Sequence, residues 1–241
     1  MENFYVIMCV TALIGAIIQG MSGFAFSIIM LMVMPYFLPY TEALALVAIT
    51  STIMMIGNLY QYRKHIVWKR LFIPILVFGG MDILSVGLLK HTETNTNIIK
   101  LLGLAFIILA LYLNFGQGKI YIKPTLRNAV LLNAVGGFVN GLFGIAGPIV
   151  VLYFMAVSDD KDEYMSTLQV FFFVTIIVDV AVRAWHGMVT MQIMQYSLYC
   201  LVFIVLGLYI GKKVFDRVDI NILCKIVYGV MVINGLVLII S

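Results

Sequence analysis

Long apolar stretches alternate with short polar ones along the whole chain. Six of the eight apolar stretches are close to the roughly 20 residues that one helix needs to cross about 30 Å of hydrocarbon. The eight stretches cover residues 4–38, 43–61, 71–89, 98–115, 128–157, 164–183, 192–211 and 222–240. This pattern predicts an all-α polytopic membrane protein with eight apolar segments.

The first and fifth stretches are too long for one simple helix. No formal charge occurs from Asn3 to Thr41 or from Asn128 to Ser158, which are runs of 39 and 31 residues. At about 1.5 Å per residue, straight helices of these lengths would measure roughly 58 and 46 Å. Each run is therefore predicted to be a broken helix or a re-entrant hairpin that reaches only part-way into the bilayer.

Both long stretches carry the same small and polar residues at a constant spacing of 121 positions. The matched pairs are Gly15 with Gly136, Gln19 with Asn140, Gly20 with Gly141, Gly23 with Gly144, and Ala25 with Ala146. The same spacing relates His65 to His186, each just after the second stretch of its half. We interpret residues 1–241 as a single transmembrane domain that contains two internal repeats, 1–120 and 121–241.

The distribution of Lys and Arg favours the re-entrant interpretation, because these residues gather in cytoplasmic loops. If all eight stretches cross the bilayer, eight of the fifteen Lys and Arg residues fall on one side and seven on the other. If the first and fifth stretches are re-entrant, the division becomes twelve against three. Each half then crosses three times, so the halves have opposite topology. Inverted repeats with a broken helix in each are typical of secondary transporters.

The amino-acid composition excludes most soluble functions. The apolar set AVILMFWYC makes up 63% of the chain and charged residues only 11%, with a mean hydropathy of +1.09. A soluble domain carries about 25% charged residues. The net charge of +4 therefore indicates loop orientation in a bilayer and not nucleic-acid binding. Cys9, Cys200 and Cys224 stand singly in apolar runs, and we expect neither a metal site nor a cofactor.

The two predicted breaks form the candidate binding site. A helix interrupted at mid-membrane exposes backbone N–H groups and the positive end of its dipole, which together bind an anion without a buried Lys or Arg. Glycines let the backbone approach a ligand closely, and a proline suits the first turn of the half-helix that follows. The alternative is that these small residues only allow close helix packing. The candidate substrate-binding residues are Gln19, Gly20, Ser22, Gly23, Phe24, Asn140, Gly141, Gly144, Gly147 and Pro148.

Two acidic residues lie inside apolar stretches, where an ionisable group costs roughly 2.5 kcal/mol or more and is a functional candidate by default. Asp82 lies in the middle of the third stretch without a partner in its own segment, so it is the first candidate for proton coupling. Asp179 is the second candidate, although Arg183 follows four residues later and can pair with it on one helix face. A simple structural role for Asp82 is a bond to a neighbouring helix.

Two runs of the sequence carry a resemblance to a known family: Gly20-x-Ser22-Gly23-Phe24-x-Phe26-Ser27 followed by Pro35, and Gly141-x-x-Gly144-x-x-Gly147-Pro148. Over essentially its whole length, the chain resembles the TauE/SafE family of sulfite and organosulfonate exporters. The resemblance implies a multi-pass carrier in the cytoplasmic membrane of a prokaryote, coupled to protons, with no enzymatic activity. The implied partners are the lipid bilayer and a small sulfur anion such as sulfite, thiosulfate or a sulfonate, held at the two glycine motifs.

The sequence departs from the resembled family in both motifs. The family tends to carry Gly where this chain has Ala25 and Ala146, and a second Pro where it has Ile149. These changes narrow the expected pocket and so bear on the identity of the anion.

Two other functions fit parts of the pattern. Inverted half-helices also build pores, and the sequence does not separate an anion channel from a carrier. Gly20-Met21-Ser22-Gly23 fits the GxSG pattern of intramembrane serine proteases, in which Ser22 would be the nucleophile. The repeat places Phe143 opposite Ser22, and neither His65 nor His186 lies well inside a segment. The protease is therefore the weaker alternative.

Overall fold

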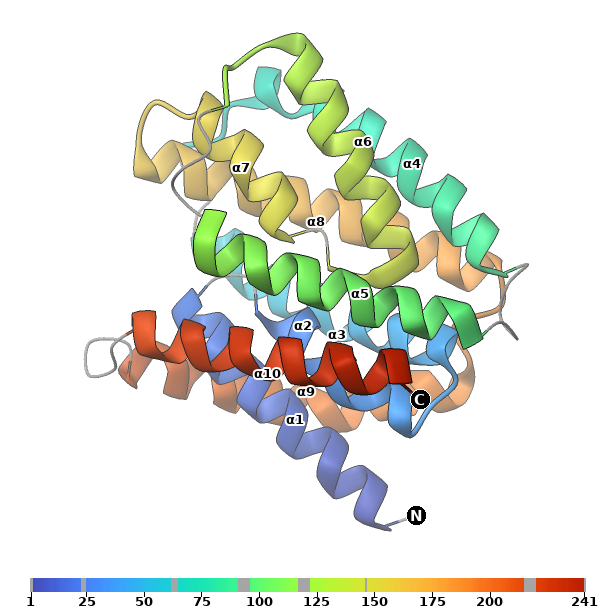
Figure 1. Ribbon diagram of the computed structural model, residues 1–241. Helices are drawn as coiled ribbons and strands as arrows, with labels where there is room; N and C mark the ends of the chain where they lie inside the picture. The colour runs from blue at the N-terminus through green and yellow to red at the C-terminus, as the bar shows by residue number, and fades with distance from the viewer. Residues whose placement is uncertain are drawn as a thin grey trace. The chain divides into compact units, whose positions relative to one another are not determined.

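The computed structural model describes residues 2–22, 25–61, 65–90, 96–116, 122–145, 147–214 and 220–240. Every regular element within these ranges is helical, which confirms the predicted all-α class (Figure 1). The elements are α1 (Glu2–Ser22), α2 (Phe26–Val33), η1 (Met34–Tyr36), α3 (Tyr40–Gln61), η2 (Trp68–Arg70), α4 (Phe72–Lys90), α5 (Thr96–Leu111), η3 (Tyr112–Gly116), α6 (Leu126–Phe143), α7 (Gly147–Val157), α8 (Lys161–Trp185), α9 (Met191–Val214) and α10 (Ile220–Ile240).

Five helices among the described residues are long and apolar enough to cross a membrane, by length and composition. Their apolar windows are Asn3–Gly20, Trp68–Lys90, Asn97–Phe115, Asp162–Trp185 and Met191–Gly211. Shorter apolar helical runs cover Phe26–Tyr36, Tyr40–Ile56, Gly147–Val157 and Val227–Ile240. The short runs include α2 and α7, the second parts of the two stretches that were predicted to be broken.

The first long stretch is a helical hairpin. α1 ends at Ser22, and α2 begins at Phe26. A Cβ atom placed on Gly15 would lie 3.1 Å from the Phe26 ring. A straight helix would separate these two residues by about 16 Å along its axis. The chain therefore turns back on itself after Ser22, which confirms the predicted break.

The fifth long stretch is also a helical hairpin. α6 ends at Phe143, and its C-cap residue Gly144 has a φ of +65°, a left-handed conformation that glycine adopts without a steric cost. Its amide donates to the Asn140 carbonyl at 2.7 Å and so closes the last turn of α6. α7 begins at Gly147 and returns along α6, because a Cβ atom on Gly136 would lie 3.0 Å from Val150.

The chain divides into two compact units, each built from segments distant in sequence. Unit 1 comprises Met1–Ala43, Thr92–Ile120 and Tyr199–Ser241, and unit 2 comprises Leu44–His91 and Tyr121–Leu198. Unit 1 contains the hairpin α1–α2, and unit 2 contains the hairpin α6–α7. These boundaries cut across the predicted repeats 1–120 and 121–241, and the single-domain assignment stays a prediction.

In unit 1, the long arm α1 packs against α9 in the same direction. The rings of Tyr5 and Tyr199 lie 5.6 Å apart near one end of this pair. Further along both helices, a Cβ atom on Gly211 would lie 2.5 Å from the Ile17 carbonyl oxygen. The two backbones are therefore in direct contact, which only a residue without a side chain permits.

Unit 1 also contains an antiparallel pair, α5 and α10. A Cβ atom on Gly103 would lie 2.5 Å from the Gly235 carbonyl oxygen and 3.1 Å from Leu238. A Cβ atom on Gly235 would lie 2.8 Å from Ile107. Rising residue numbers on α5 thus meet falling numbers on α10, with glycine facing glycine where the helices cross.

In unit 2, α4, α6 and α8 run in the same direction. α6 lies directly on α4, because a Cβ atom on Gly137 would overlap the Phe78 backbone (Figure 1). Arg70 just before α4 pairs with Glu163 in the first turn of α8. At the other end of the two helices, Gly87 lies near His186.

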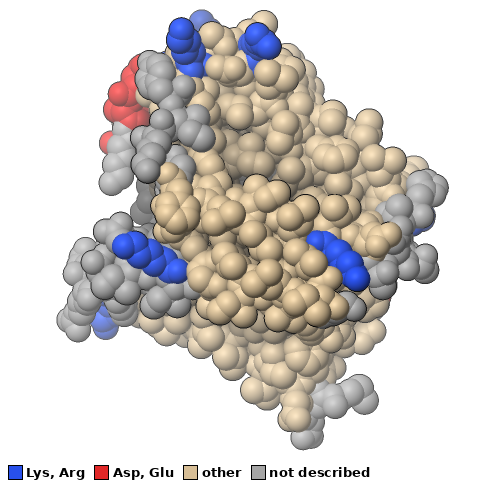
Figure 2. Space-filling view, viewed as in Figure 1, with Lys and Arg blue, Asp and Glu red and all other residues tan. Residues whose placement is uncertain are grey.

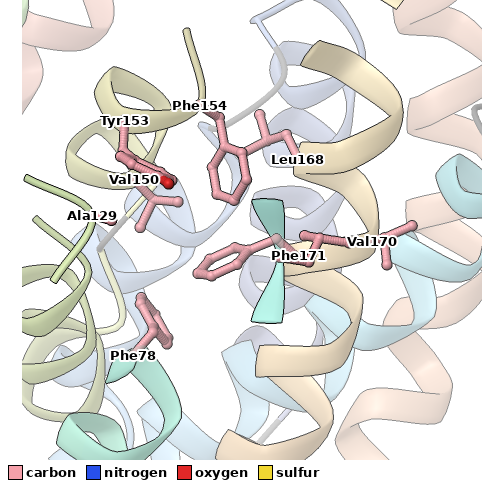
Figure 3. Packing of buried hydrophobic residues seen from close by; sticks show 9 residues of the cluster. Phe78, Ala129, Val150, Tyr153, Phe154, Leu168, Val170 and Phe171 are labelled. Carbon is pink, nitrogen blue, oxygen red and sulfur yellow. The ribbon is translucent and has the colours of Figure 1, made fainter. Parts of the chain in front are cut away.

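An aromatic core joins α4, α7 and α8 of unit 2 (Figure 3). The Phe171 ring meets the Phe78 ring edge-to-face at 5.2 Å and the Phe154 ring at 5.0 Å. Such aromatic pairs contribute about 0.5–1.5 kcal/mol beyond the area they bury. The short helix α7 is therefore held in place by its packing against α4 and α8. Its first residues directly follow the break.

The helix pairs exchange elements between the predicted halves. α1 of the first half packs on α9 of the second, α6 of the second packs on α4 of the first, and α5 packs on α10. Two repeats of inverted topology would produce this exchange. The duplication and the inverted arrangement both stay predictions.

Candidate substrate and proton site

Neutral groups close the first break, in unit 1. The Phe26 amide at the start of α2 donates to Gln19 Oε1 at 3.0 Å, and both residues are buried. The Gln19 side chain thereby satisfies one of the backbone N–H groups that the break exposes. Gly20 lies against α9, with its Cβ position 3.4 Å from the Gly211 Cα atom.

Three predicted residues of the first break cannot be placed in full. Ser22 is the last residue of α1, and its side chain lies outside the described part of the structure. Gly23 and Phe24 lie outside the described residues. Their predicted binding roles stay predictions.

Charged groups contact the last turn of α6, just before the second break, in unit 2. Asp82 on α4 is fully buried, and its Oδ1 atom accepts a hydrogen bond from Asn140 Nδ2 on α6 at 2.9 Å. Asp82 Oδ2 has no hydrogen-bond partner among the described residues. The predicted structural role of Asp82, a bond to a neighbouring helix, is thus present and leaves one buried oxygen unsatisfied.

Asp179 and Arg183 form the ion pair that their spacing on α8 predicts. Arg183 Nε donates to Asp179 Oδ1 at 2.8 Å, and both side chains are buried. Asp82 lies close enough to interact electrostatically with both residues of this pair. Two carboxyl groups and one guanidinium therefore share a buried cluster on α4 and α8, which we call the acid–arginine cluster (Asp82, Asp179 and Arg183).

Arg183 also caps the end of α6. Its Nη2 atom donates to the carbonyl of Gly141 at 3.1 Å and to that of Asn140 at 3.4 Å. These carbonyls belong to the last turn of α6, where the negative end of the helix dipole lies. The guanidinium therefore stabilises the helix end that precedes the break.

Gly141 is required for this arrangement by close packing. A Cβ atom on Gly141 would overlap Ser85 Oγ and lie 2.8 Å from the Asp82 carbonyl oxygen. Ser85 itself donates to that carbonyl at 3.0 Å. The alternative predicted for these glycines, close helix packing, therefore holds at Gly141, and a role of Gly141 in ligand binding stays a prediction.

Gly144, Gly147 and Pro148 have the local structures that the sequence predicts. Gly144 is the C-cap of α6 and lies in the left-handed region, and Gly147 and Pro148 are the first two residues of α7. Pro148 lacks an amide hydrogen, so the first turn of α7 presents one donor fewer than an ordinary helix start. The roles of these residues in binding stay predictions.

The sequence alone does not reveal two residues of this site. Ser85 is one of several hydroxyl residues in apolar stretches, and nothing in its position marks it. Arg183 is recognisable as the partner of Asp179, but its bonds to α6 join residues more than 40 positions apart in the chain. Only the packing of α8 against the end of α6 shows this second role.

Comparison with known proteins gives one match. The family described as Sulfite exporter TauE/SafE matches residues 7–238, which include both hairpins and the acid–arginine cluster. Neither the curated proteins nor the solved structures gave a significant match. The family match and the apolar helices together indicate an integral multi-pass membrane protein. The chain belongs to the sulfite exporter TauE/SafE family.

Proposed function

We propose that this protein is a secondary transporter that carries sulfite, thiosulfate or a small sulfonate across the cytoplasmic membrane of a prokaryote, coupled to protons. The acid–arginine cluster at the second helix break carries the proposal. A buried arginine beside two buried acids is costly to assemble, and ionisable groups inside a membrane-spanning segment are functional candidates by default. Membership of the exporter family supports the class of substrate.

The substrate anion is proposed to bind at a helix break, and each unit contains one break. The starts of α2 and α7 carry backbone N–H groups and the positive ends of helix dipoles. Gly144 and Gly147 at the second break give an anion access to the backbone, and Gln19 and Asn140 contribute neutral amides. Both side-chain amides already form hydrogen bonds within the chain. A bound anion therefore replaces existing hydrogen bonds.

Charge balance in the acid–arginine cluster supports proton coupling. With both acids ionised, the three side chains carry a net charge of −1, which is costly in a buried site. One proton shared by Asp82 and Asp179 makes the cluster neutral and gives the unsatisfied Asp82 Oδ2 atom a role as donor or acceptor. Proton uptake and release at this pair is the proposed coupling step.

Asn140 links the proton to the break. Its side chain donates to Asp82, and its backbone carbonyl accepts from Arg183. A proton on Asp82 weakens the first of these bonds, since a neutral carboxyl is a poorer acceptor than a carboxylate. The last turn of α6 therefore responds to the charge of the cluster, and this turn is one wall of the proposed substrate site.

The first test is anion flux into proteoliposomes that contain the purified protein. Radiolabelled sulfite, thiosulfate and a short sulfonate are each measured with and without a pH gradient. Saturable flux that follows the gradient is expected. Flux that never saturates and ignores the gradient would instead identify an anion channel, and absence of flux for all three anions would discard the proposed substrates.

The second test removes one carboxylate of the cluster. In Asp82→Asn, flux is expected to lose its dependence on the pH gradient, because the shared proton has lost its site. Asp162→Asn is the matched control, since Asp162 is an exposed acid in the first turn of α8. Gradient-driven flux of Asp82→Asn equal to that of the control would contradict the assignment.

A further inference from the structure

The start of α7 lies level with Asp82 on α4. A Cβ atom on Gly136 of α6 would lie 3.0 Å from the Val150 side chain and 3.4 Å from the Phe78 ring, so α4, α6 and α7 meet there. Toward the break, Gly147 comes three residues before Val150 on α7, and Asp82 comes four residues after Phe78 on α4. Both steps are about one helical turn in the same direction, because α7 runs opposite to α4 and α6.

A hydrogen bond between α4 and α6 agrees with this register. Asn140 comes four residues after Gly136 on α6, and its side chain donates to Asp82 Oδ1 at 2.9 Å. The other oxygen, Asp82 Oδ2, is buried and has no hydrogen-bond partner among the described residues. A buried carboxyl oxygen without a partner therefore lies at the level where α7 begins.

The first turn of α7 offers hydrogen-bond donors at the same level. α7 has 11 residues, and the amides in the first turn of a helix have no acceptor within that helix. Pro148 has no amide hydrogen, so Gly147, Ile149 and Val150 carry the donors. These amides and the positive end of the helix dipole attract an anion. An ionised Asp82 beside them repels it.

A proton on Asp82 Oδ2 changes this carboxyl from a repulsive group into a donor. Oδ1 still accepts from Asn140, while the new O–H group is able to donate to an anion. The acid–arginine cluster becomes neutral at the same time. Packed helix axes are about 8–10 Å apart, so the charge that disappears lies close to the first turn of α7. The site therefore favours an anion only after the proton has bound.

Few other ionisable groups lie near this carboxyl. Asp179 and Arg183 face it from α8. Within the described ranges, α6 contributes only Arg127 near its start, α7 only Tyr153, and α4 only the exposed Lys90 at its last residue. On the face shown in Figure 2, charged side chains form small separate groups with broad uncharged surface between them. The charge at the break is therefore set mainly by the acid–arginine cluster.

We propose that protonated Asp82 binds the substrate anion directly at the first turn of α7, so that the proton binds before the anion and the two cross the membrane together. This inference rests on the proposed function. A sulfite dianion with one proton still carries one negative charge, so a membrane potential that is negative inside drives it outward.

Binding of methanesulfonate to the purified full-length protein tests the proposal. Methanesulfonate is the anion of a strong acid, so its own charge is the same at mildly acidic and mildly alkaline pH. Isothermal titration calorimetry in a neutral detergent measures the dissociation constant. The wild-type protein and the control Asp162→Asn are expected to bind about tenfold more tightly at acidic pH. This is the effect of one unit charge about 10 Å away at an effective dielectric constant of about 20.

Two variants of Asp82 separate its charge from its donor. Asp82→Asn is neutral at every pH and keeps a donor, so it is expected to bind at both pH values as tightly as the wild-type protein does at acidic pH. Asp82→Leu has a similar shape but no donor. Its binding is expected to be independent of pH and about tenfold weaker than that of Asp82→Asn, the effect of one hydrogen bond to a charged group.

Three results would contradict the proposal. Binding by the wild-type protein that does not change with pH would overturn it, and gradient-driven flux of methanesulfonate would then leave the proposed transport function standing. Equal affinities of Asp82→Asn and Asp82→Leu would overturn the direct contact. Absence of both binding and flux for every sulfur anion would overturn the proposed function as well.

Discussion

The two helix breaks share a glycine frame but differ in the chemistry that closes them. In unit 1, the neutral Gln19 side chain caps the start of α2. In unit 2, the positive Arg183 side chain caps the end of α6, with Asp179 and Asp82 beside it. One hairpin is thus closed at the helix start by an amide and the other at the helix end by a buried ion.

This difference separates the proposed roles of the hairpins. Asn58 and Tyr62 stand where the spacing of 121 would place equivalents of Asp179 and Arg183, and Phe203 stands at the equivalent of Asp82. The charged cluster therefore has no counterpart in the equivalent sequence positions. The proposed anion-binding role therefore applies to both breaks, and the proposed proton site applies to the second break alone.

Loss of the Arg183 side chain is expected to lower the free energy of unfolding more than any other change considered. Arg183→Met leaves Asp179 buried without its partner and the end of α6 without its cap. Removal of one member of a buried pair costs about 3–5 kcal/mol. Unfolding of the purified protein in detergent measures the loss. The double variant Arg183→Met/Asp179→Leu is expected to recover most of it, and a double variant no more stable than the single one would contradict the pairing.

Replacement of the matched glycines Gly20 and Gly141 by alanine is expected to have an intermediate effect on the free energy of unfolding. In Gly141→Ala, the new methyl group overlaps Ser85, and overpacking of this kind costs about 1–3 kcal/mol. In Gly20→Ala, the same methyl group is 3.4 Å from its neighbours on α9, and the free energy of unfolding is expected to change by less than about 1 kcal/mol. Equal losses at the two positions would show that the breaks are packed alike.

Loss of the Gln19 side chain that caps α2 is expected to have the smallest effect on the free energy of unfolding. Gln19→Leu removes the side-chain acceptor of the Phe26 amide, and the loss of an N-terminal cap costs about 1 kcal/mol. Because no proton is held there, the dependence of sulfite flux on the pH gradient is expected to be unchanged. A variant that still transports sulfite but has lost this dependence would place the coupling in unit 1.

The sequence predicts the helices and both breaks because apolar length and glycine spacing are local properties. The uncharged run before Glu42 and the run between Arg127 and Asp159 exceed what one helix can use in a bilayer, and both are hairpins in the structure. The spacing of Asp179 and Arg183 likewise predicts their ion pair, since residues four apart meet on one helix face.

The sequence does not predict which helices those side chains reach. Asp82 bonds Asn140, and Arg183 bonds the end of α6, only because Gly137 and Gly141 allow α4 and α6 to touch. Whether a glycine serves packing or ligand access depends on its neighbour in space, which spacing along the chain does not reveal. The composition of the acid–arginine cluster therefore required the structure.

The most direct test of the account is a count of the protons that move with each sulfite ion. A pH-sensitive dye inside proteoliposomes reports proton movement while radiolabelled sulfite reports substrate flux. The wild-type protein and Gln19→Leu are expected to give the same fixed ratio of protons to sulfite, and Asp82→Asn is expected to move sulfite without protons or not at all. If Asp82→Asn gave the wild-type ratio, the proton would be carried elsewhere and the central claim would be wrong.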